Sequence, residues 1–192
     1  MTSGVKSPRN ANNDPGPMVD FSFANLTSLL EIDGEVPRNK TSCKTSNGKF
    51  RSTSLKFNNN KLADLEGLDK AVDLLESPSD LEFLDLSFNE ILKLDNDILQ
   101  YPKLKILYLH GNMISNLEEI NKLAALPNLY NLAIHGNPIE NEPEFRPYIL
   151  SHLPHLKKLN SAPITKADHK DAERWKTICG SKKKRRRRKD TD

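Results

Sequence analysis

The sequence contains little cysteine, few aromatic residues and no long apolar run. Two of its 192 residues are cysteine, and its aromatic residues are one Trp, four Tyr and seven Phe. Cys43 and Cys179 form no C-x-x-C motif, so the usual zinc and redox motifs are excluded and two free thiols of an intracellular protein are expected. No apolar run approaches the roughly 18 residues of a membrane-spanning helix. The first 17 residues are polar, so we expect no secretory signal.

Leucine and asparagine are abundant instead, with 27 and 19 residues, and they recur together. Four segments share the pattern L-x-L-x-x-N-x-(I/L), in which Phe57 and Ile134 each replace one Leu. These segments are residues 54–62, 83–91, 106–114 and 131–139. The asparagines of the pattern are 29, 23 and 25 residues apart, which is the period of leucine-rich repeats. They are Asn60, Asn89, Asn112 and Asn137.

Each repeat predicts a short strand, a sharp turn and a helical return. Alternating leucines such as Leu107 and Leu109 point inward from a strand. A buried Asn at the turn needs hydrogen-bond partners, so we expect the four to form a ladder that bonds the turn and the next repeat. Residues 66–76 and 117–126 have helical apolar spacing. Because no coil can bury its apolar face alone, the pattern predicts a right-handed α/β solenoid of four repeats.

The repeats divide the chain into four parts. Residues 1–20 predict a disordered tail. Residues 21–51 predict a polar linker that includes an N-terminal cap or latch at Phe21–Ile32. Residues 52–179 predict the repeat domain with a C-terminal cap, and residues 180–192 predict a disordered basic tail.

The predicted C-terminal cap combines two helices. Residues 145–159 indicate a helix and then half a repeat. Thr165 and Asp168 form a capping-box-like pattern that opens a second helix, which we expect to end near Cys179. We expect Trp175 to cover the last coil, because it shares one face of this helix with two other apolar residues. The three residues of that face are Ala172, Trp175 and Ile178.

The repeats resemble the short leucine-rich repeat type of the protein-phosphatase-regulator and U2 snRNP A-prime group, which ends in a similar cap. Further pieces between residues 19 and 178 resemble one subgroup of small repeat proteins. These pieces are VDFSF at 19–23, NNN at 58–60, LSFN at 86–89, LYLHGN at 107–112, NKLA at 121–124, HGNP at 135–138, TKAD at 165–168 and E-x-WK at 173–176. The resemblance implies a small, non-catalytic cytoplasmic protein without a cofactor. Similar proteins belong to larger assemblies in cilia and flagella.

The outward positions of the strands predict a binding surface on the concave face. Phe83, Ile106 and Tyr108 form an exposed apolar cluster there, within a rim of charged residues and histidines, as is typical of protein interfaces. Single exposed apolar residues are also normal on any surface, which is the alternative interpretation. The predicted protein-binding residues are Lys56, Asn58, Phe83, Asp85, Ser87, Ile106, Tyr108, His110, Asn131 and His135. Phe88 lies at the strand-to-turn edge and is interpreted either as surface or as a structural spine residue.

The histidines give the strongest site-like signal. His110 and His135 occupy the same position in adjacent repeats, so we expect them to stack about 5 Å apart. With Asp85 or Ser87 they could form a metal pair, but a zinc site needs four placed ligands, and one H-G-N turn used twice is the favoured interpretation. The sequence has no G-x-G-x-x-G, P-loop, H-E-x-x-H or G-x-S-x-G motif. We therefore predict no catalytic, cofactor or metal site.

A run of eight basic residues ends the chain. It comprises Lys182, Lys183, Lys184, Arg185, Arg186, Arg187, Arg188 and Lys189, and without it the net charge of +3 becomes −5. The run is interpreted as a nuclear localisation signal, a nucleic-acid patch, an arm for an acidic surface such as tubulin tails, or a solubilising tail. It contains no aromatic residue, which argues against base stacking, and charge alone attaches proteins weakly to membranes. The resemblance does not include this run.

Together these patterns predict a non-enzymatic protein–protein interaction module. We expect its concave face to bind an axonemal or cytoskeletal protein within a larger cytoplasmic, ciliary or axonemal assembly. The alternative is a nuclear ribonucleoprotein adaptor, in which the basic tail supplies nuclear import or phosphate contacts.

Overall fold

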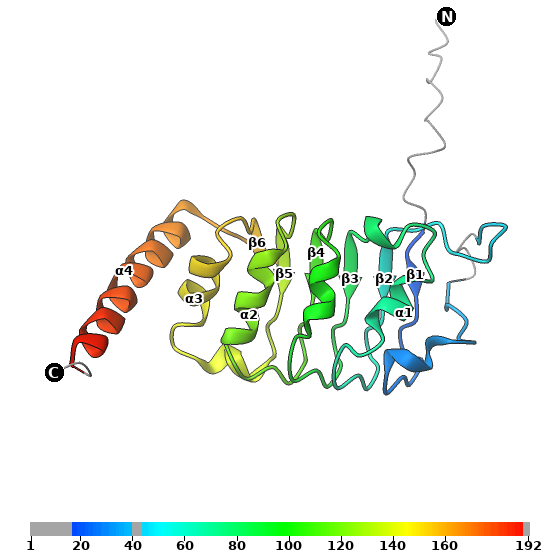
Figure 1. The fold of residues 1–192 in the computed structure, drawn as a ribbon, viewed down its shortest axis with the longest axis horizontal. Coiled ribbons are helices and arrows are strands. Elements are labelled where there is room, and N and C mark those ends of the chain that lie inside the picture. The colour runs from blue at the N-terminus through cyan, green and yellow to red at the C-terminus, as the bar shows by residue number, and fades with distance from the viewer. Residues whose placement is uncertain (1–16, 40–43, 190–192) are drawn as a thin grey trace, which may run out of the picture.

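A single sheet that follows sequence order organises the molecule (Figure 1). The computed structural model describes residues 17–39 and 44–189, with side chains described up to residue 179. Six strands pair in parallel and the seventh is antiparallel to the sixth. The strands are β1 (Val19–Asp20), β2 (Ser54–Lys56), β3 (Phe83–Asp85), β4 (Ile106–Tyr108), β5 (Asn131–Ala133), β6 (Lys158–Leu159) and β7 (Ala162–Pro163). This is the predicted α/β solenoid of leucine-rich repeats.

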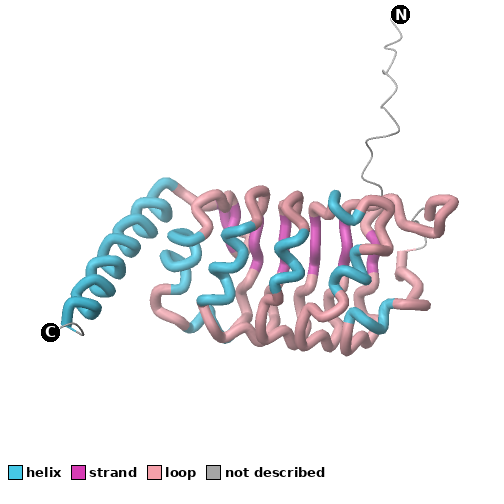
Figure 2. Tube along the Cα trace, in the orientation of Figure 1, coloured by secondary structure: helices cyan, strands magenta, loops and turns pink. Residues whose placement is uncertain are grey.

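Short helices return the chain along one face of the sheet (Figures 1 and 2). The α-helices are α1 (Leu68–Val72), α2 (Glu118–Lys122), α3 (Phe145–His152) and α4 (Lys166–Lys189). The 3-10 helices are η1 (Leu29–Ile32), η2 (Pro78–Asp80), η3 (Asn96–Gln100), η4 (Leu123–Ala125) and η5 (Pro138–Asn141). The opposite face of the sheet, which we call the strand face, corresponds to the predicted concave surface.

The core lies between the sheet and these return segments. One leucine of each strand from β2 to β6 is in register with the next and fully buried, as Leu84 and Leu107 illustrate. The row comprises Leu55, Leu84, Leu107, Leu132 and Leu159, and Val19 of β1 continues it. Burial of each such side chain stabilises the fold by roughly 1.5–3 kcal/mol, and it requires the neighbouring coils on both sides. Stacking is therefore the source of stability, as the pattern predicts.

The predicted asparagine ladder is present and regular. The side-chain amide of Asn112 donates to the carbonyls of Leu109 and Leu86 at 2.9 and 3.0 Å, and its Oδ1 accepts the N–H of Ile91 at 3.0 Å. Asn60, Asn89 and Asn137 make the same three contacts in their own coils. The direction differs from the expectation, because each Asn bonds its own turn and the preceding repeat, not the next one. The N–H that needs an acceptor, such as that of Ile91, belongs to the turn of the preceding repeat, where no neighbouring strand accepts it.

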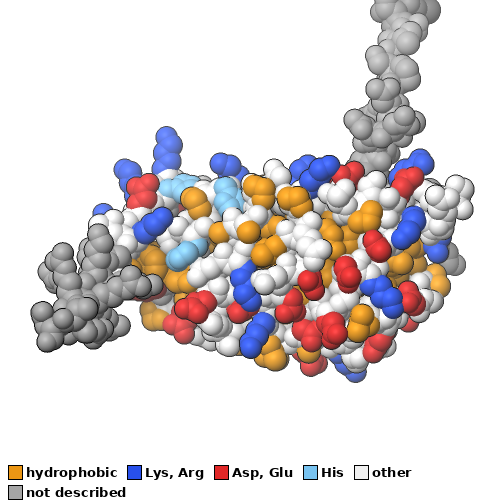
Figure 3. Space-filling model, in the orientation of Figure 1, with side chains coloured by type: hydrophobic (Ala, Val, Ile, Leu, Met, Phe, Trp, Pro, Cys, Tyr) orange, Lys and Arg blue, Asp and Glu red, His pale blue; other side chains and the backbone are white. Residues whose placement is uncertain are grey.

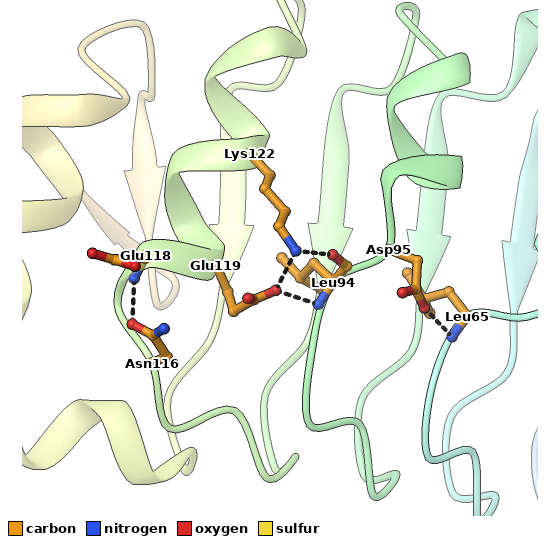
Figure 4. A network of polar contacts seen from close by, with 7 residues as sticks. All are labelled: Leu65, Leu94, Asp95, Asn116, Glu118, Glu119 and Lys122. Atoms are coloured by element: carbon orange, nitrogen blue, oxygen red, sulfur yellow. Dashed lines mark hydrogen bonds and ion pairs between the residues drawn. The ribbon is translucent and has the colours of Figure 1, made fainter.

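Carboxylates form a second row of acceptors where the return segments begin (Figure 4). The N–H of Leu65 donates to Asp95 at 3.1 Å, and the N–H of Leu94 donates to Glu119 at 2.8 Å. Lys122 donates to both the Leu94 carbonyl and the Glu119 carboxylate, at 2.6 and 2.8 Å. A side chain of the following coil thus satisfies the backbone of the coil before it.

The N-terminal segment forms a complete extra coil, which corrects two predicted boundaries. Residues 1–20 were predicted to be a tail, but β1 already pairs with β2 from Val19 onward. Phe21 stacks on Phe57 with ring centroids 5.4 Å apart, and its carbonyl accepts the amide of Asn60. The segment predicted as a cap or latch therefore continues the sheet, the core and the ladder. Residues 1–16 and 40–43, including Cys43, lie outside the described residues.

The C-terminal cap forms as predicted at its start. Thr165 and Asp168 make a reciprocal capping box: the Thr165 N–H donates to Asp168 at 2.8 Å and the Asp168 N–H to Thr165 Oγ1 at 3.2 Å. Trp175 is half-buried and packs edge-on against Tyr148 of α3, with centroids 5.4 Å apart. Trp175 therefore joins α4 to α3 and does not cover the last coil itself. Ala172 is buried, whereas Ile178 remains 48% exposed.

The helix of the cap is longer than expected. It was predicted to end near Cys179 and to be followed by a disordered tail at residues 180–192, but α4 continues to Lys189. Lysine and arginine have high helix propensity, and no proline follows Thr165, so the backbone carries the helix through Gly180. The side chains of the basic run, Lys182 to Lys189, lie outside the described residues. Cys179 is a free, half-buried thiol.

Candidate functional site

The strand face carries the predicted residues in the predicted register. Neighbouring strands align position by position, so that Phe83 lies beside Ile106 and Asp85 beside Tyr108. The first row is Ser54, Phe83, Ile106, Asn131 and Lys158, and the second is Lys56, Asp85, Tyr108 and Ala133. The alternation of the strands alone brings these side chains to one surface.

Five rings form a connected cluster across this face, which we call the aromatic cluster. Phe83 and Tyr108 meet edge-on with centroids 5.4 Å apart, and Tyr108 meets His110 at 5.9 Å. His110 lies 5.0 Å from Phe88 and stacks on His135 at 4.8 Å, with only 7° between the ring planes. Edge-to-face pairs of this kind each contribute about 0.5–1.5 kcal/mol beyond area burial. The cluster is therefore a preorganised surface, and the predicted stacking of the histidines is confirmed.

Several predicted contact residues are less exposed than the sequence suggested. Asp85, Ser87 and Asn131 are buried, with 6%, 2% and 8% of their surface exposed. Asp85 Oδ1 accepts both the hydroxyl of Ser87 at 2.6 Å and its N–H at 3.0 Å, which holds the pair inward. Their predicted exposure on the concave face is therefore wrong, because flanking strands about 4.8 Å away cover short side chains, and their contact with a partner stays a prediction.

The remaining predicted residues are half-buried, so only their outer parts reach solvent. The apolar centre was expected to be exposed, but its side chains lean on their neighbours along the rows. The half-buried set is Lys56, Asn58, Phe83, Ile106, Tyr108, His110 and His135. The accessible surface is therefore a shallow band of ring edges and polar tips, which suits contact with another protein and offers no deep pocket for a small molecule.

The surroundings of His110 favour its neutral form. Burial, and then the neighbouring His135, lower the pKa of His110, while Asp85 opposes this shift. The Nδ1 atoms of both rings are buried without a hydrogen-bond partner, so a proton placed there would be unsatisfied. The part of the chain that the structure describes contains no group of three His, Cys, Asp or Glu residues placed to hold a metal ion. The pair thus adds flat ring surface to the aromatic cluster.

Phe88 is the functional candidate that the sequence left undecided. Its backbone is left-handed, with φ of 53°, and its side chain is 53% exposed. It packs over Gly111, where an added Cβ would lie 2.7 Å from the Phe88 ring. A core spine residue would be buried, so Phe88 belongs to the surface. The signal was present in the alignment, because the positions equivalent to Phe88 in the next two repeats are Gly111 and Gly136.

The hydroxyl of Ser87 on the strand face is buried and donates to Asp85. No helix within residues 17–39 or 44–189 is long and apolar enough to cross a bilayer. The strand face offers a partner three kinds of contact: the rings of the aromatic cluster, side-chain amides such as that of Asn58, and the ammonium group of Lys56.

Comparisons with known proteins agree with this architecture. A family model described as leucine-rich repeat matches residues 53–189. Leucine-rich repeat-containing protein 51 of Macaca mulatta is 40% identical over 178 residues, which cover 91% of this chain and 93% of that protein. The Bos taurus protein of the same name is 42% identical over 165 residues, which cover 84% and 86%.

A solved structure shares the fold. The crystal structure of the Drosophila melanogaster SNF/U2A′ complex contains a chain that superimposes with a TM-score of 0.56. The match covers 64% of this chain and 67% of that chain at 24% identity. At that identity the likeness concerns the arrangement of the coils.

Proposed function

The chain belongs to the leucine-rich repeat family, and on that premise we propose that it binds a partner protein through the aromatic cluster on its strand face. The family is one of protein–protein interaction modules, and the subgroup resembled by the sequence is that of leucine-rich repeat-containing protein 51. One observation carries the proposal: five rings from three neighbouring coils form one continuous surface on the face that has no helices over it.

The cluster has the composition of an interaction hot spot. Phe83 and Tyr108 contact each other edge-on and are half-buried, so a partner would cover their exposed edges at little entropic cost. Lys56 lies beside Asp85 at the margin of the same rows and can contact an acidic group of the partner. Because hot-spot residues each contribute about 2 kcal/mol or more, removing both rings should weaken binding by 100-fold or more.

The test compares two pairs of substitutions. Immobilised full-length protein, wild type or Phe83→Ala/Tyr108→Ala, captures proteins from extracts of ciliated cells, which are quantified by mass spectrometry. Each protein lost with the variant is then purified and its dissociation constant is measured by calorimetry. The control, Leu30→Ala/Val36→Ala, truncates two exposed apolar residues outside the strand face. Equal affinity of every purified partner for both variants and the wild type would exclude the strand face as the binding site.

We also propose that the protein acts in a cytoplasmic assembly, and in ciliated cells in the axoneme. The support is the resemblance of residues 19–178 to a subgroup of small repeat proteins. Retention of the tagged protein in detergent-extracted cilia is the expected result. Nuclear accumulation that disappears when Lys182–Lys189 is deleted would instead favour the ribonucleoprotein adaptor, and salt-sensitive RNA binding would then be measured.

A further inference from the structure

An exposed apolar strip runs along the turns that follow the strands. Backbone hydrogen bonds link the turns of neighbouring coils here. The Leu92 N–H donates to the Ala63 carbonyl at 3.2 Å, and the Met113 N–H donates at 3.0 Å to the carbonyl of Ile91, the residue before Leu92. Leu92 is 57% and Met113 is 51% exposed. We call Ala63, Leu92, Met113 and Pro138 the turn strip; all four are exposed. Apolar side chains aligned in this way point to a contact surface.

Negative charge borders the turn strip on the side of the helices. Asp64, Glu66, Asp95 and Asp97 line a shallow hollow of about 440 Å³ in the same coils. Figure 3 shows acidic side chains gathered over the lower part of this face, with apolar side chains along its lower edge. None of the four carboxylates is in an ion pair with any described residue. We call these four residues the acidic border.

Negative charge also acts on the buried Tyr101. Its pKa is raised to about 12 by burial and then by the charges of Asp69, Asp73 and Asp97, of which Asp97 belongs to the acidic border. A ligand of this surface must therefore combine positive charge with an apolar contact. An uncharged or acidic segment would leave the carboxylates uncompensated.

The chain itself carries a segment of that chemistry. Helix α4 ends in eight consecutive basic residues, and Ile178 is exposed just before them. Without these residues the rest of the chain has a net charge of −5. The segment cannot reach the acidic border of its own molecule, because α4 extends from the opposite end of the sheet, beyond β6 (Figure 1). Its length of about 36 Å directs the basic end away from the coils that carry the border.

We propose that the turn strip and the acidic border form a docking surface for the basic end of α4 of a second copy of this chain. The contact joins two different surfaces at opposite ends of the molecule. It is therefore a heterologous, head-to-tail contact that can repeat from copy to copy. Charge attraction supplies the orientation, and Leu92 with Met113 supplies the apolar area. This self-association involves none of the aromatic cluster, so the strand face of every copy stays available.

Charge reversal on each side separates the two halves of the contact. The variant Glu66→Lys/Asp97→Lys changes the border at one exposed and one half-exposed residue. Asp97 accepts a hydrogen bond from Gln100, and within the described part of the chain the Glu66 side chain forms no hydrogen bond or ion pair. Arg185→Glu with Arg187→Glu changes the basic end. We expect the wild-type chain to self-associate in sedimentation experiments at protein concentrations of about 10–200 µM and low salt. The association constant should be about tenfold smaller at 300 mM than at 50 mM salt. Each variant alone should be monomeric.

Mixing the two variants gives the decisive result. Glu66→Lys/Asp97→Lys keeps an intact basic end, and Arg185→Glu/Arg187→Glu keeps an intact acidic border. The mixture should therefore form 1:1 complexes that neither protein forms alone. The control Glu35→Lys/Glu142→Lys makes the same charge change at exposed positions elsewhere and should associate like the wild type. Leu92→Ser/Met113→Ser should lower the association constant.

Three outcomes overturn the proposal. A wild-type chain that is monomeric at 200 µM in 50 mM salt, a mixture that stays monomeric, or a control as defective as the border variant would each show that another surface or general charge attraction is involved. Circular dichroism of each variant before mixing establishes that it is folded.

Discussion

Replacement of Asn112 by alanine tests how the ladder distributes its stability. The side chain makes three contacts, to the carbonyls of Leu86 and Leu109 and to the N–H of Ile91, and it is only 3% exposed. If each contact left a buried group unsatisfied, the loss would be about 3–9 kcal/mol, since each such group costs about 1–3 kcal/mol.

The structure predicts a smaller loss, because neighbouring ladder residues share the carbonyls. Leu86 also accepts from Asn89, and Leu109 also accepts from Asn137, at 3.0 and 2.9 Å. Only one N–H is left without a partner in Asn112→Ala. We therefore expect the free energy of unfolding to fall by about 2–3 kcal/mol, measured by urea denaturation with an unchanged m-value.

The last rung of the ladder provides the discriminating comparison. In Asn137→Ala the N–H of Ile114 and the carbonyl of Ile134 both lose their partner, and no other hydrogen bond to that carbonyl is formed by the described residues. This variant should lose about 1 kcal/mol more than Asn112→Ala. Asn128→Ala, at an exposed Asn with one contact to a carbonyl, is the control and should change stability by less than about 1 kcal/mol. An equal loss for Asn112→Ala and Asn137→Ala would refute the sharing argument.

Three further substitutions follow from single contacts. Gly111→Ala places a Cβ 2.7 Å from Phe88 at φ of +68° and should lower the free energy of unfolding by about 2 kcal/mol, with part of the loss recovered by Phe88→Ala in a double-mutant cycle. The hydrogen bonds from Arg146 and from the Thr165 backbone lower the pKa of Asp168. The carboxylate therefore stabilises the fold above its unfolded pKa near 4, and this stabilisation is lost as the pH falls. Asp168→Asn should lower the free energy of unfolding by about 1–2 kcal/mol at pH 7, and denaturation curves at lower pH should show a smaller difference. Glu119→Ala leaves the Leu94 N–H unsatisfied and should cost about 2 kcal/mol, whereas Glu119→Gln keeps an acceptor and should cost about half as much by the same assay.

The parts of the structure that repeat could be predicted from the sequence. The Asn spacing places the ladder, and the alternation of leucines places the core and the rows of the strand face, because each depends on residues a few positions apart. The parts that depend on neighbours distant in sequence could not. Val19–Asp20 pairs with Leu55–Lys56, about 36 residues away, in a coil that lacks a ladder Asn. The burial of Asp85 likewise depends on the strands on both sides.

Charge and helix propensity compete at the C-terminal end, and the predicted disorder of residues 180–192 follows from charge alone. Eight adjacent positive charges repel, which favours a disordered run. Lysine and arginine also lose little rotamer freedom in a helix, and the run continues a helix already fixed by the capping box of Thr165 and Asp168. Because nucleation is complete before residue 180, each further residue needs only propagation, and the helix extends to Lys189.

The residue before each ladder Asn shows how the fold separates stability from recognition. Asn59, Phe88, Gly111 and Gly136 all have positive φ, at 58°, 53°, 68° and 69°, although only glycine favours this region. Phe23 holds the same position in the N-terminal coil with φ of 58°, although Ala24 and not Asn follows it. The repeated turn itself therefore imposes this backbone shape, and a non-glycine residue there costs about 1–2 kcal/mol. The side chain at this position points outward whatever its identity. Two coils place an aromatic ring there: Phe23, which is 60% exposed, and Phe88, which joins the aromatic cluster and adds contact surface to it in exchange for that strain.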